Sequence, residues 1–231
     1  QIWGHHLDQA IPLQHLVGRC PWRDLELAVS AAALIPRQET EVLVDLALET
    51  IAGMSIERWA DLGTGSGAIA VALSRAMPAT PGHAVDLSPD ALALARTNLE
   101  ALAPEGEWHL HQGRWWEPLE PWWGHIDLVV CNPPYIPSDL ILNLDPVVRD
   151  HEPHLALAGG IDGLQAIREV VAGVCRALAP GGWILIEHHH DQSAPVLNLL
   201  NQAGLSSIRA ARDLEGVNRF ALARRSLSPC S

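Results

Sequence analysis

From about residue 57 onward, short apolar runs alternate with longer stretches in which apolar residues recur at helical spacing. Short apolar runs bounded by turn residues predict buried strands, and a spacing of three and four predicts helices. The predicted strands are Arg58–Leu62, His83–Asp86, Trp108–His111, Ile126–Cys131, Trp183–His188, Ser206–Ala210 and Phe220–Ala223. This alternation predicts an α/β fold with a doubly wound, mostly parallel sheet of seven strands and helices on both faces.

Residues that start and stop helices mark the segments between these strands. Ser88-Pro89-Asp90 combines a capping serine with proline at the first helical position, ahead of a predicted helix over Ala91–Leu102. The stretch Asp162–Leu178 has the same spacing and ends before a Pro-Gly-Gly segment. Before the first strand, Glu39–Ile51 is predicted to be an amphipathic helix and residues 13–33 a hairpin.

Composition narrows the possible classes of protein. The 231 residues, 48% of them hydrophobic, suffice for one sizeable core. Because no run of about 18 apolar residues occurs and the opening segment Gln1–Gln14 is polar, we expect no membrane partner and a cytoplasmic location. A formal charge of −12 and the absence of lysine argue against a nucleic-acid partner. Four widely spaced cysteines without a C-x-x-C pair predict no metal site. Separately, we expect the protein to be a monomer.

A glycine-rich segment follows the first predicted strand of the sheet. Asp61-Leu62-Gly63-Thr64-Gly65-Ser66-Gly67 precedes a helix that begins near Ala68, a context in which glycines let a ligand approach the backbone closely. Asp86 ends the next strand, where a carboxylate can accept both hydroxyls of a ribose. The pattern predicts a nucleoside site. An NAD enzyme shares the glycine spacing, but Asp61 would repel a pyrophosphate and suits the ammonium of a methionine moiety.

A second motif, Asn132-Pro133-Pro134-Tyr135, follows the predicted strand Ile126–Cys131. It lies at the carboxyl edge of the sheet, where open α/β proteins bind ligands. Proline extends neither a strand ladder nor a helix interior, which leaves the Asn132 side chain and the Pro133 carbonyl free of regular pairing. The alternative is a turn in which Asn132 caps the backbone. Its position in a nucleoside-binding sheet favours a functional interpretation.

Two such acceptors suit a carboxamide as methyl acceptor. An amide nitrogen is a poor nucleophile because its lone pair is delocalised into the carbonyl. Accepting its two N–H bonds, at the Asn132 side-chain oxygen and the Pro133 carbonyl, would hold the nitrogen toward a methyl carbon and stabilise developing positive charge. The Tyr135 ring can pack over the planar group, with a cation–π component toward a sulfonium. No general base is required, because the methylated nitrogen is strongly acidic.

Together these segments resemble the release-factor glutamine methyltransferases, a family within the class I methyltransferases. The resemblance covers nearly the whole chain from Pro12 onward. It is carried by Ile35–Glu41, Asp61–Gly67, Asp86–Ala91, Asn132–Tyr135, Glu152-Pro153, Gly159–Leu164 and Asp213–Gly216. Two positions depart from the family pattern: Gln38 stands where proline is usual, and Arg114 stands where an acidic residue often precedes an aromatic that packs on the adenine.

The resemblance implies a Rossmann-like fold, S-adenosyl-L-methionine as cofactor, and peptide chain release factors as partners. The methyl group would pass to the side-chain amide nitrogen, N5, of the glutamine in their Gly-Gly-Gln motif. The implied cofactor-binding residues are Gly63, Thr64, Gly65, Ser66, Gly67, Asp86, Trp115 and Asn132. The implied catalytic residues are Asn132, Pro133 and Tyr135, and the substrate-binding residues are these three with Pro134. Arg37, Glu39 and Thr40 are secondary candidates, because the family's Ile-Pro-Arg segment lies near the cleft.

The resemblance also divides the chain into a linker and hairpin, residues 1–38, and a catalytic domain, residues 39–231. The family's N-terminal helical bundle is expected to be absent. The segment Glu187–Asp191 contains three histidines, but neighbours on an extended segment point to opposite faces, so we expect no metal there. We expect His188 or His190 to line the cleft or face water.

Other function classes remain open at this point. An exocyclic nitrogen of adenine or guanine has the same planar, two-hydrogen geometry as an amide, so an amino-methyltransferase acting on nucleic acid is one alternative. A non-catalytic nucleoside-binding module of the translation apparatus is another, and an NAD dehydrogenase is the third.

Overall fold

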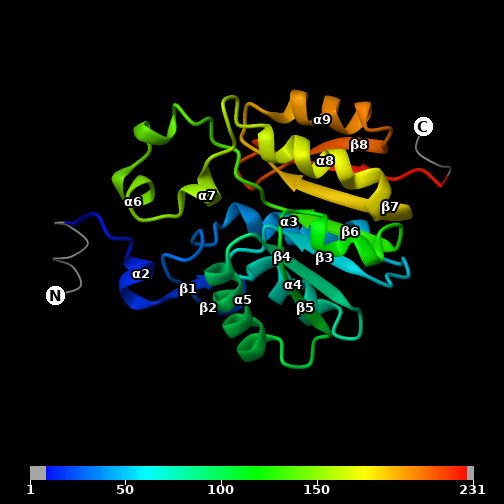
Figure 1. The fold of residues 1–231 in the computed structure, drawn as a ribbon. Helices are drawn as coiled ribbons and strands as arrows, with labels where there is room; N and C mark the ends of the chain where they lie inside the picture. The colour runs from blue at the N-terminus through cyan, green and yellow to red at the C-terminus, as the bar shows by residue number, and fades with distance from the viewer. Residues whose placement is uncertain (1–8, 228–231) are drawn as a thin grey trace.

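A seven-stranded sheet lies between two layers of helices in the computed structural model, which describes residues 9–227 (Figure 1). The strand order is β5-β4-β3-β6-β7-β9-β8. The first five of these pair in parallel, whereas β9 runs antiparallel to both β7 and β8. The predicted α/β class, with its doubly wound and mostly parallel sheet, is confirmed.

The strands lie close to their predicted positions. They are β3 (Trp59–Leu62), β4 (Gly82–Asp86), β5 (Trp108–Gln112), β6 (Ile126–Cys131), β7 (Leu178–Glu187), β8 (Ser206–Arg212) and β9 (Asn218–Arg224). The largest difference is at β7, which begins at Leu178 instead of Trp183 because Leu178 already pairs with Ile126 of β6. An irregularity in the β6–β7 pairing then accommodates the Pro-Gly-Gly segment within the strand.

The helices cover both faces of the sheet. They are α3 (Glu39–Thr50), α4 (Ala68–Ala76), α5 (Pro89–Leu102), α8 (Gln165–Ala177) and α9 (Ser193–Gln202), with the 3-10 helix η1 (Glu117–Trp122). Helices α3, α4 and α5 pack in one core cluster, and η1, α8 and α9 pack in the other. The Ser88 hydroxyl accepts a hydrogen bond from the Ala91 amide at the start of α5, as its sequence predicts.

Alternation along the central strands separates these two clusters. In β6, Leu128 and Val130 point into the α3–α5 cluster, whereas Val129 and Cys131 point into the α8–α9 cluster. All four side chains are fully buried. Burial on both faces is expected of parallel strands covered by helices, and it holds the strand ends in a defined register at the carboxyl edge.

Smaller elements gather at that carboxyl edge. The N-terminal part holds α2 (Leu13–Val17) and the hairpin β1 (Arg19–Trp22) and β2 (Leu25–Ala28), which pair antiparallel as predicted. The connection between β6 and α8 holds η2 (Ile141–Asn143), α6 (Pro146–Arg149) and α7 (His154–Leu157). Figure 1 shows both groups on the side to which the β7 arrow points, so they lie over the strand ends.

Within residues 9–227, no helix combines the length and apolar character needed to cross a bilayer. Residues 1–8 of the polar opening segment Gln1–Gln14 lie outside the described residues.

Trp116 anchors the segment between β5 and η1. Its side chain is 5% exposed, and its indole nitrogen donates to the Val170 carbonyl of α8 over 2.7 Å. The indole packs so closely on α8 that a Cβ added to Gly173 would lie 2.3 Å from its Cδ1 atom. Gly173 therefore provides the space that Trp116 occupies, and Trp116 in turn fixes the turn that carries Trp115.

We predict that Gly173→Ala lowers the free energy of unfolding by about 1–3 kcal/mol, because the added methyl overpacks the Trp116 contact. Ala172, exposed on the same helix, is the matched control. Ala172→Gly should also lower stability, by about 1 kcal/mol, through helix propensity alone. Urea denaturation measures both. If Gly173→Ala were instead more stable than wild type, the higher helix propensity of alanine would explain the result. The close packing of Trp116 on Gly173 would then be contradicted.

Candidate active site

A cavity of about 450 Å³ opens at the carboxyl ends of β3, β4 and β6. Its walls come from the linker before α3, the loops after β3, β4, β5 and β6, and the start of α8. This volume lies in the range of small-molecule sites, and its place at the strand ends is where open α/β sheets bind ligands. Of the predicted site residues, it is lined by Gly63, Thr64, Gly65, Ser66, Asp86, Trp115, Asn132 and Pro134.

The glycine loop forms one wall through a backbone that favours glycine. Gly63, Gly65 and Gly67 have φ angles of 76°, 55° and 81°. Side chains at these positions would be strained, so the loop presents bare backbone to the cavity. Gly67 itself does not line the cavity: a Cβ there would lie 3.0 Å from the Cα of Ala95. Its role is to let the start of α4 pack closely on α5.

Asp86 joins this loop to the end of β4. One carboxylate oxygen accepts from the Gly65 amide over 2.8 Å and the other from the Ser88 amide over 2.9 Å. Burial raises the pKa of Asp86, while these amides act in the opposite direction. Each oxygen keeps a further lone pair, so the carboxylate that lines the cavity can still accept hydroxyls from a ligand.

Asp61 lies deeper than the sequence suggests. Its side chain is fully buried and does not line the cavity, although the motif predicts a carboxylate beside the ligand. The Thr64 hydroxyl donates to Oδ2 over 2.6 Å, while Oδ1 is buried without a hydrogen-bond partner among the described residues. Burial raises the pKa of Asp61 to about 7, against the effect of Thr64. Thr64 thus separates this carboxyl group from the cavity.

Trp115 faces the glycine loop from the opposite side. Its ring lies 3.3 Å from the position of a Cβ on Gly63, and its backbone has a φ of 48°, which is uncommon for a side chain of this size. The indole nitrogen donates to Glu169 over 2.8 Å. Arg114 pairs with the same carboxylate through two 2.8 Å hydrogen bonds. Arg114 therefore holds Glu169, which fixes the ring of Trp115 in the cavity wall.

The Asn132 side chain is held in one orientation by α3. Its amide nitrogen donates to the Thr40 hydroxyl over 3.1 Å, and both residues line the cavity. The Thr40 hydroxyl in turn donates to Glu187 over 2.8 Å. With its nitrogen engaged in this way, the Asn132 oxygen is the side-chain atom left to accept a hydrogen bond from a ligand.

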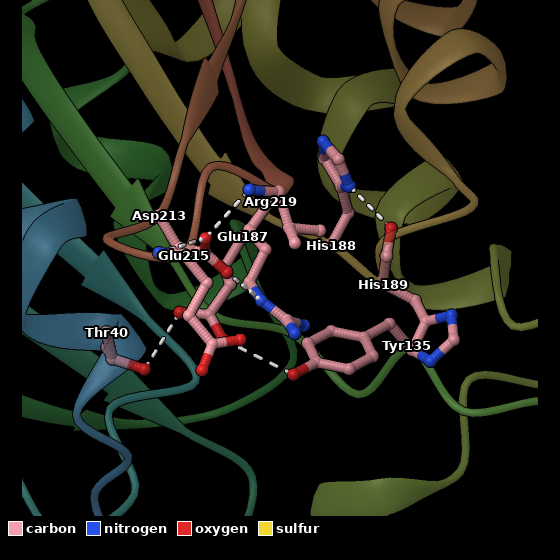
Figure 2. Close-up of polar contacts among 9 residues, drawn as sticks. Thr40, Tyr135, Glu187, His188, His189, Asp213, Glu215 and Arg219 are labelled. Atoms are coloured by element: carbon pink, nitrogen blue, oxygen red, sulfur yellow. Dashed lines mark hydrogen bonds and ion pairs between the residues drawn. The ribbon is translucent and has the colours of Figure 1, made fainter.

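Tyr135 and Pro133 lie behind the cavity wall. The Tyr135 hydroxyl donates to Glu187 over 3.3 Å, as Figure 2 shows, and its backbone carbonyl accepts from Gln192 over 3.0 Å. Burial raises the pKa of Tyr135 above its ordinary value, so the phenol stays protonated. Pro133 is buried. Tyr135, Pro133 and Gly67 are the predicted site residues that do not line the cavity.

The secondary candidates also include residues that line the cavity and one that does not. Arg37 and Thr40 line the cavity, whereas Glu39 does not. Arg37 forms an ion pair with Glu152, whose carboxylate also accepts from the Ile35 amide. Burial raises the pKa of Glu152, and Arg37 opposes that effect. The pair ties the linker to the segment between β6 and α8, so these two parts of the wall form one unit.

The histidines after β7 do not contribute to the cavity. His188 is fully buried and His190 is exposed, so the expectation that one of them lines the cleft or faces water holds only for His190. Glu187, by contrast, contacts Thr40 and Tyr135 from behind the cavity, a connection that the sequence does not predict. The signal for Glu187 was its place at the carboxyl end of the strand next to the one that carries Asn132.

Comparison with known proteins first identifies the class of fold. The family model of the methyltransferase small domain matches residues 38–141. The catalytic domain of hMettl16, solved with the MAT2A 3'UTR hairpin 6, matches with a TM-score of 0.66 at 14% identity over 97% of this chain and 78% of that chain. TrmN from Thermus thermophilus matches with a TM-score of 0.55 at 21% identity over 80% and 48%. The fold is that of the class I methyltransferases.

Curated relatives then give the family. The chain is 58% identical to the release factor glutamine methyltransferase of Prochlorococcus marinus, over 97% of this chain and 77% of the relative. It is 45% identical to the enzyme of that name from Gloeobacter violaceus, over 95% and 76%. The chain belongs to the release factor glutamine methyltransferase family, as its motifs predict.

The buried Asp61 makes stability depend on pH. Its pKa of about 7 exceeds the ordinary 3.8, so the folded state holds the proton more tightly, and the free energy of unfolding falls as pH rises between these values. We predict that Asp61→Asn, relative to wild type, gains about 2–3 kcal/mol between pH 5 and pH 8.

Urea denaturation at the two pH values, without cofactor, measures this difference. Asp139→Asn, at an exposed position, is the control and should track wild type at both values. An equal effect of Asp61→Asn at pH 5 and pH 8 would contradict the raised pKa.

Proposed function

We propose that this protein transfers the methyl group of S-adenosyl-L-methionine to the side-chain amide nitrogen, N5, of the glutamine in the Gly-Gly-Gln motif of peptide chain release factors. The observation that carries the proposal is the hydrogen bond from the Asn132 amide nitrogen to Thr40, which leaves the oxygen of this cavity-lining residue as the free acceptor. The name shared by the relatives supports the substrate.

The cavity fits the cofactor. A nucleoside-sized volume, a bare glycine backbone, a carboxylate at the end of β4 and an aromatic ring in one wall are the features that a nucleoside requires. Asp86 would accept the ribose hydroxyls, Trp115 would pack on the adenine, and Gly63–Ser66 would lie along the rest of the molecule. The bound cofactor supplies a methyl group on a positively charged sulfur.

Asn132 and Pro133 then orient the substrate amide. The Asn132 oxygen accepts one N–H of the glutamine. For the Pro133 carbonyl to accept the other, the amide must reach past the lining residues Asn132 and Pro134, between which Pro133 lies in the chain. The nitrogen, and not the oxygen, then faces the methyl group. Fixing this geometry lowers the barrier, because reaction needs the nitrogen in line with the carbon–sulfur bond. The same two acceptors stabilise positive charge as the new N–C bond forms. The nitrogen then loses one proton to water, which restores a neutral amide.

The main rival is methylation of a base nitrogen in nucleic acid, since an exocyclic amine could use the same two acceptors. The formal charge of −12 and the absence of lysine oppose it, because binding of nucleic acid depends on cations that neutralise phosphates. A protein partner fits this charge better. In this proposal the enzyme acts as a cytoplasmic monomer, and residues 39–231 form its catalytic domain.

We predict that Asn132→Ala lowers kcat for release-factor methylation by about 10²-fold or more, the usual effect of removing one group that stabilises charge in the transition state. The measurement is mass spectrometry of the Gly-Gly-Gln peptide, where methylation adds about 14 Da. Asn201→Ala, at an exposed position on α9, is the matched control and should keep the wild-type rate.

A parallel assay with transcribed RNA as the substrate tests the alternative function, methylation of a base nitrogen in nucleic acid. Methyl transfer to RNA and none to the release factor, by wild-type protein with labelled cofactor, would overturn the assignment. An Asn132→Ala protein that methylates the release factor at the wild-type rate would show that the amide is oriented by other groups.

A further inference from the structure

Glu187 is a buried carboxylate at the end of β7 that binds two hydroxyl groups from different parts of the chain. Its side chain is 1% exposed. Oε2 accepts from Thr40 of α3 over 2.8 Å, and Oε1 accepts from Tyr135, in the motif after β6, over 3.3 Å. Figure 2 shows the carboxylate between these two residues. Glu187 therefore connects α3, β7 and the substrate motif at one point.

This arrangement decides the direction of the hydrogen bonds. An ionised carboxylate can only accept, so the single proton of the Thr40 hydroxyl must point to Glu187. Toward Asn132 the Thr40 oxygen can then only accept a hydrogen bond. The amide nitrogen of Asn132 can donate one, whereas its amide oxygen cannot. The two ends of an amide have almost the same shape, so shape alone does not select one. The carboxylate of Glu187, acting through the Thr40 hydroxyl, selects the amide nitrogen of Asn132 as the end that faces Thr40.

We propose that Glu187 is a positioning residue for methyl transfer, and that it turns the oxygen of Asn132 toward the substrate through the Thr40 hydroxyl while holding Tyr135 through its phenol. The inference rests on the proposed function and deepens it. Glu187 does not line the cavity and acts through residues that do, or that lie directly behind its wall.

The surroundings of Glu187 do not suit a purely structural role. Among the described residues no cation forms an ion pair with it, and Arg219, drawn nearby in Figure 2, pairs with Asp213. A buried carboxylate without a cation is costly, and an apolar residue of similar size would normally be more stabilising. Retaining the carboxylate gives two directed hydrogen bonds beside the substrate motif.

The ionisation of Glu187 supports the same role. Burial raises its pKa to about 7, and Glu39 acts in the same direction, whereas Thr40, Tyr135 and Arg219 favour the charged form. When Glu187 is protonated it can donate to Thr40, and the direction of the bond to Asn132 is no longer imposed. The orientation is therefore best held above pH 7, and the rate of methylation should rise as pH increases through about 7.

The test compares variants of Glu187 and Thr40 in release-factor methylation. Glu187→Gln places an N–H group where one hydroxyl needs an acceptor, so we expect kcat to fall about tenfold and the rise through pH 7 to disappear. Thr40→Val keeps the shape of the side chain but removes the hydroxyl, and should also lose about tenfold. Thr40→Ser keeps the hydroxyl and should stay within about twofold of wild type.

Two further readouts separate positioning from structural damage. In the Thr40→Val background, Glu187→Gln should cost much less than in wild type, because the main connection to Asn132 is already broken. The affinity for S-adenosylhomocysteine should change little, since Glu187→Gln and Thr40→Val leave the glycine loop, Asp86 and Trp115 unchanged. The melting temperature of each variant shows how much of its loss of kcat comes from loss of folded protein.

The inference is overturned if wild type is active while Glu187→Gln keeps the same kcat and pH profile, or if the two losses are fully additive. Loss of activity in step with loss of folded protein, without rescue by Thr40→Ser, also overturns it. Wild-type protein that methylates no release factor would instead refute the proposed function, on which the inference depends.

Discussion

One hydrogen bond sets the chemical character of this site: the amide nitrogen of Asn132 donates to the Thr40 hydroxyl over 3.1 Å. An asparagine at a strand end could turn either its donor or its acceptor toward a ligand. With the nitrogen held by Thr40, the cavity receives an acceptor, and the site is suited to a group that carries N–H bonds. In the proposed function, the preference for an amide nitrogen over an amide oxygen as the reacting atom follows from this orientation.

The fold makes that bond possible by bringing distant segments to one edge. Thr40 comes from α3, Asn132 follows β6, and Glu187 ends β7, which lies beside β6 in the sheet. Two apolar clusters on the faces of the sheet bury most of the side chains of the central strands and hold the strand ends in register. That core stability offsets the cost of two buried carboxyl groups near the site, Asp61 and Glu187, whose pKa values are each raised by burial to about 7.

The parts of the structure that follow from local pattern could be predicted from sequence. Strand and helix positions came from apolar spacing, and the glycine loop and Asn132 came from short motifs after strands. The start of β7 was misjudged because its first residues pair with β6 across a Pro-Gly-Gly segment, which local pattern does not show. Trp115 was expected as an adenine contact, but its support by Glu169 of α8 depends on packing between distant elements.

The connection that orients Asn132 could not be derived from sequence. Thr40 is 92 positions away from Asn132, and Glu187 is 147 positions away from Thr40. Only the order of strands in the sheet brings them together. A carboxylate beside three histidines suggested a metal cluster more readily than a hydrogen-bond partner. Asp61 shows the opposite case, since a motif placed it at the ligand and the structure buries it behind Thr64.

The most direct measurement is a crystal structure of the protein with S-adenosylhomocysteine and a release-factor domain that carries the Gly-Gly-Gln loop. We expect the glutamine nitrogen to lie within about 3 Å of both the Asn132 side-chain oxygen and the Pro133 carbonyl, facing the cofactor sulfur. A glutamine bound with its oxygen toward Asn132, or an Asn132 side chain turned away from Thr40, would contradict the central claim.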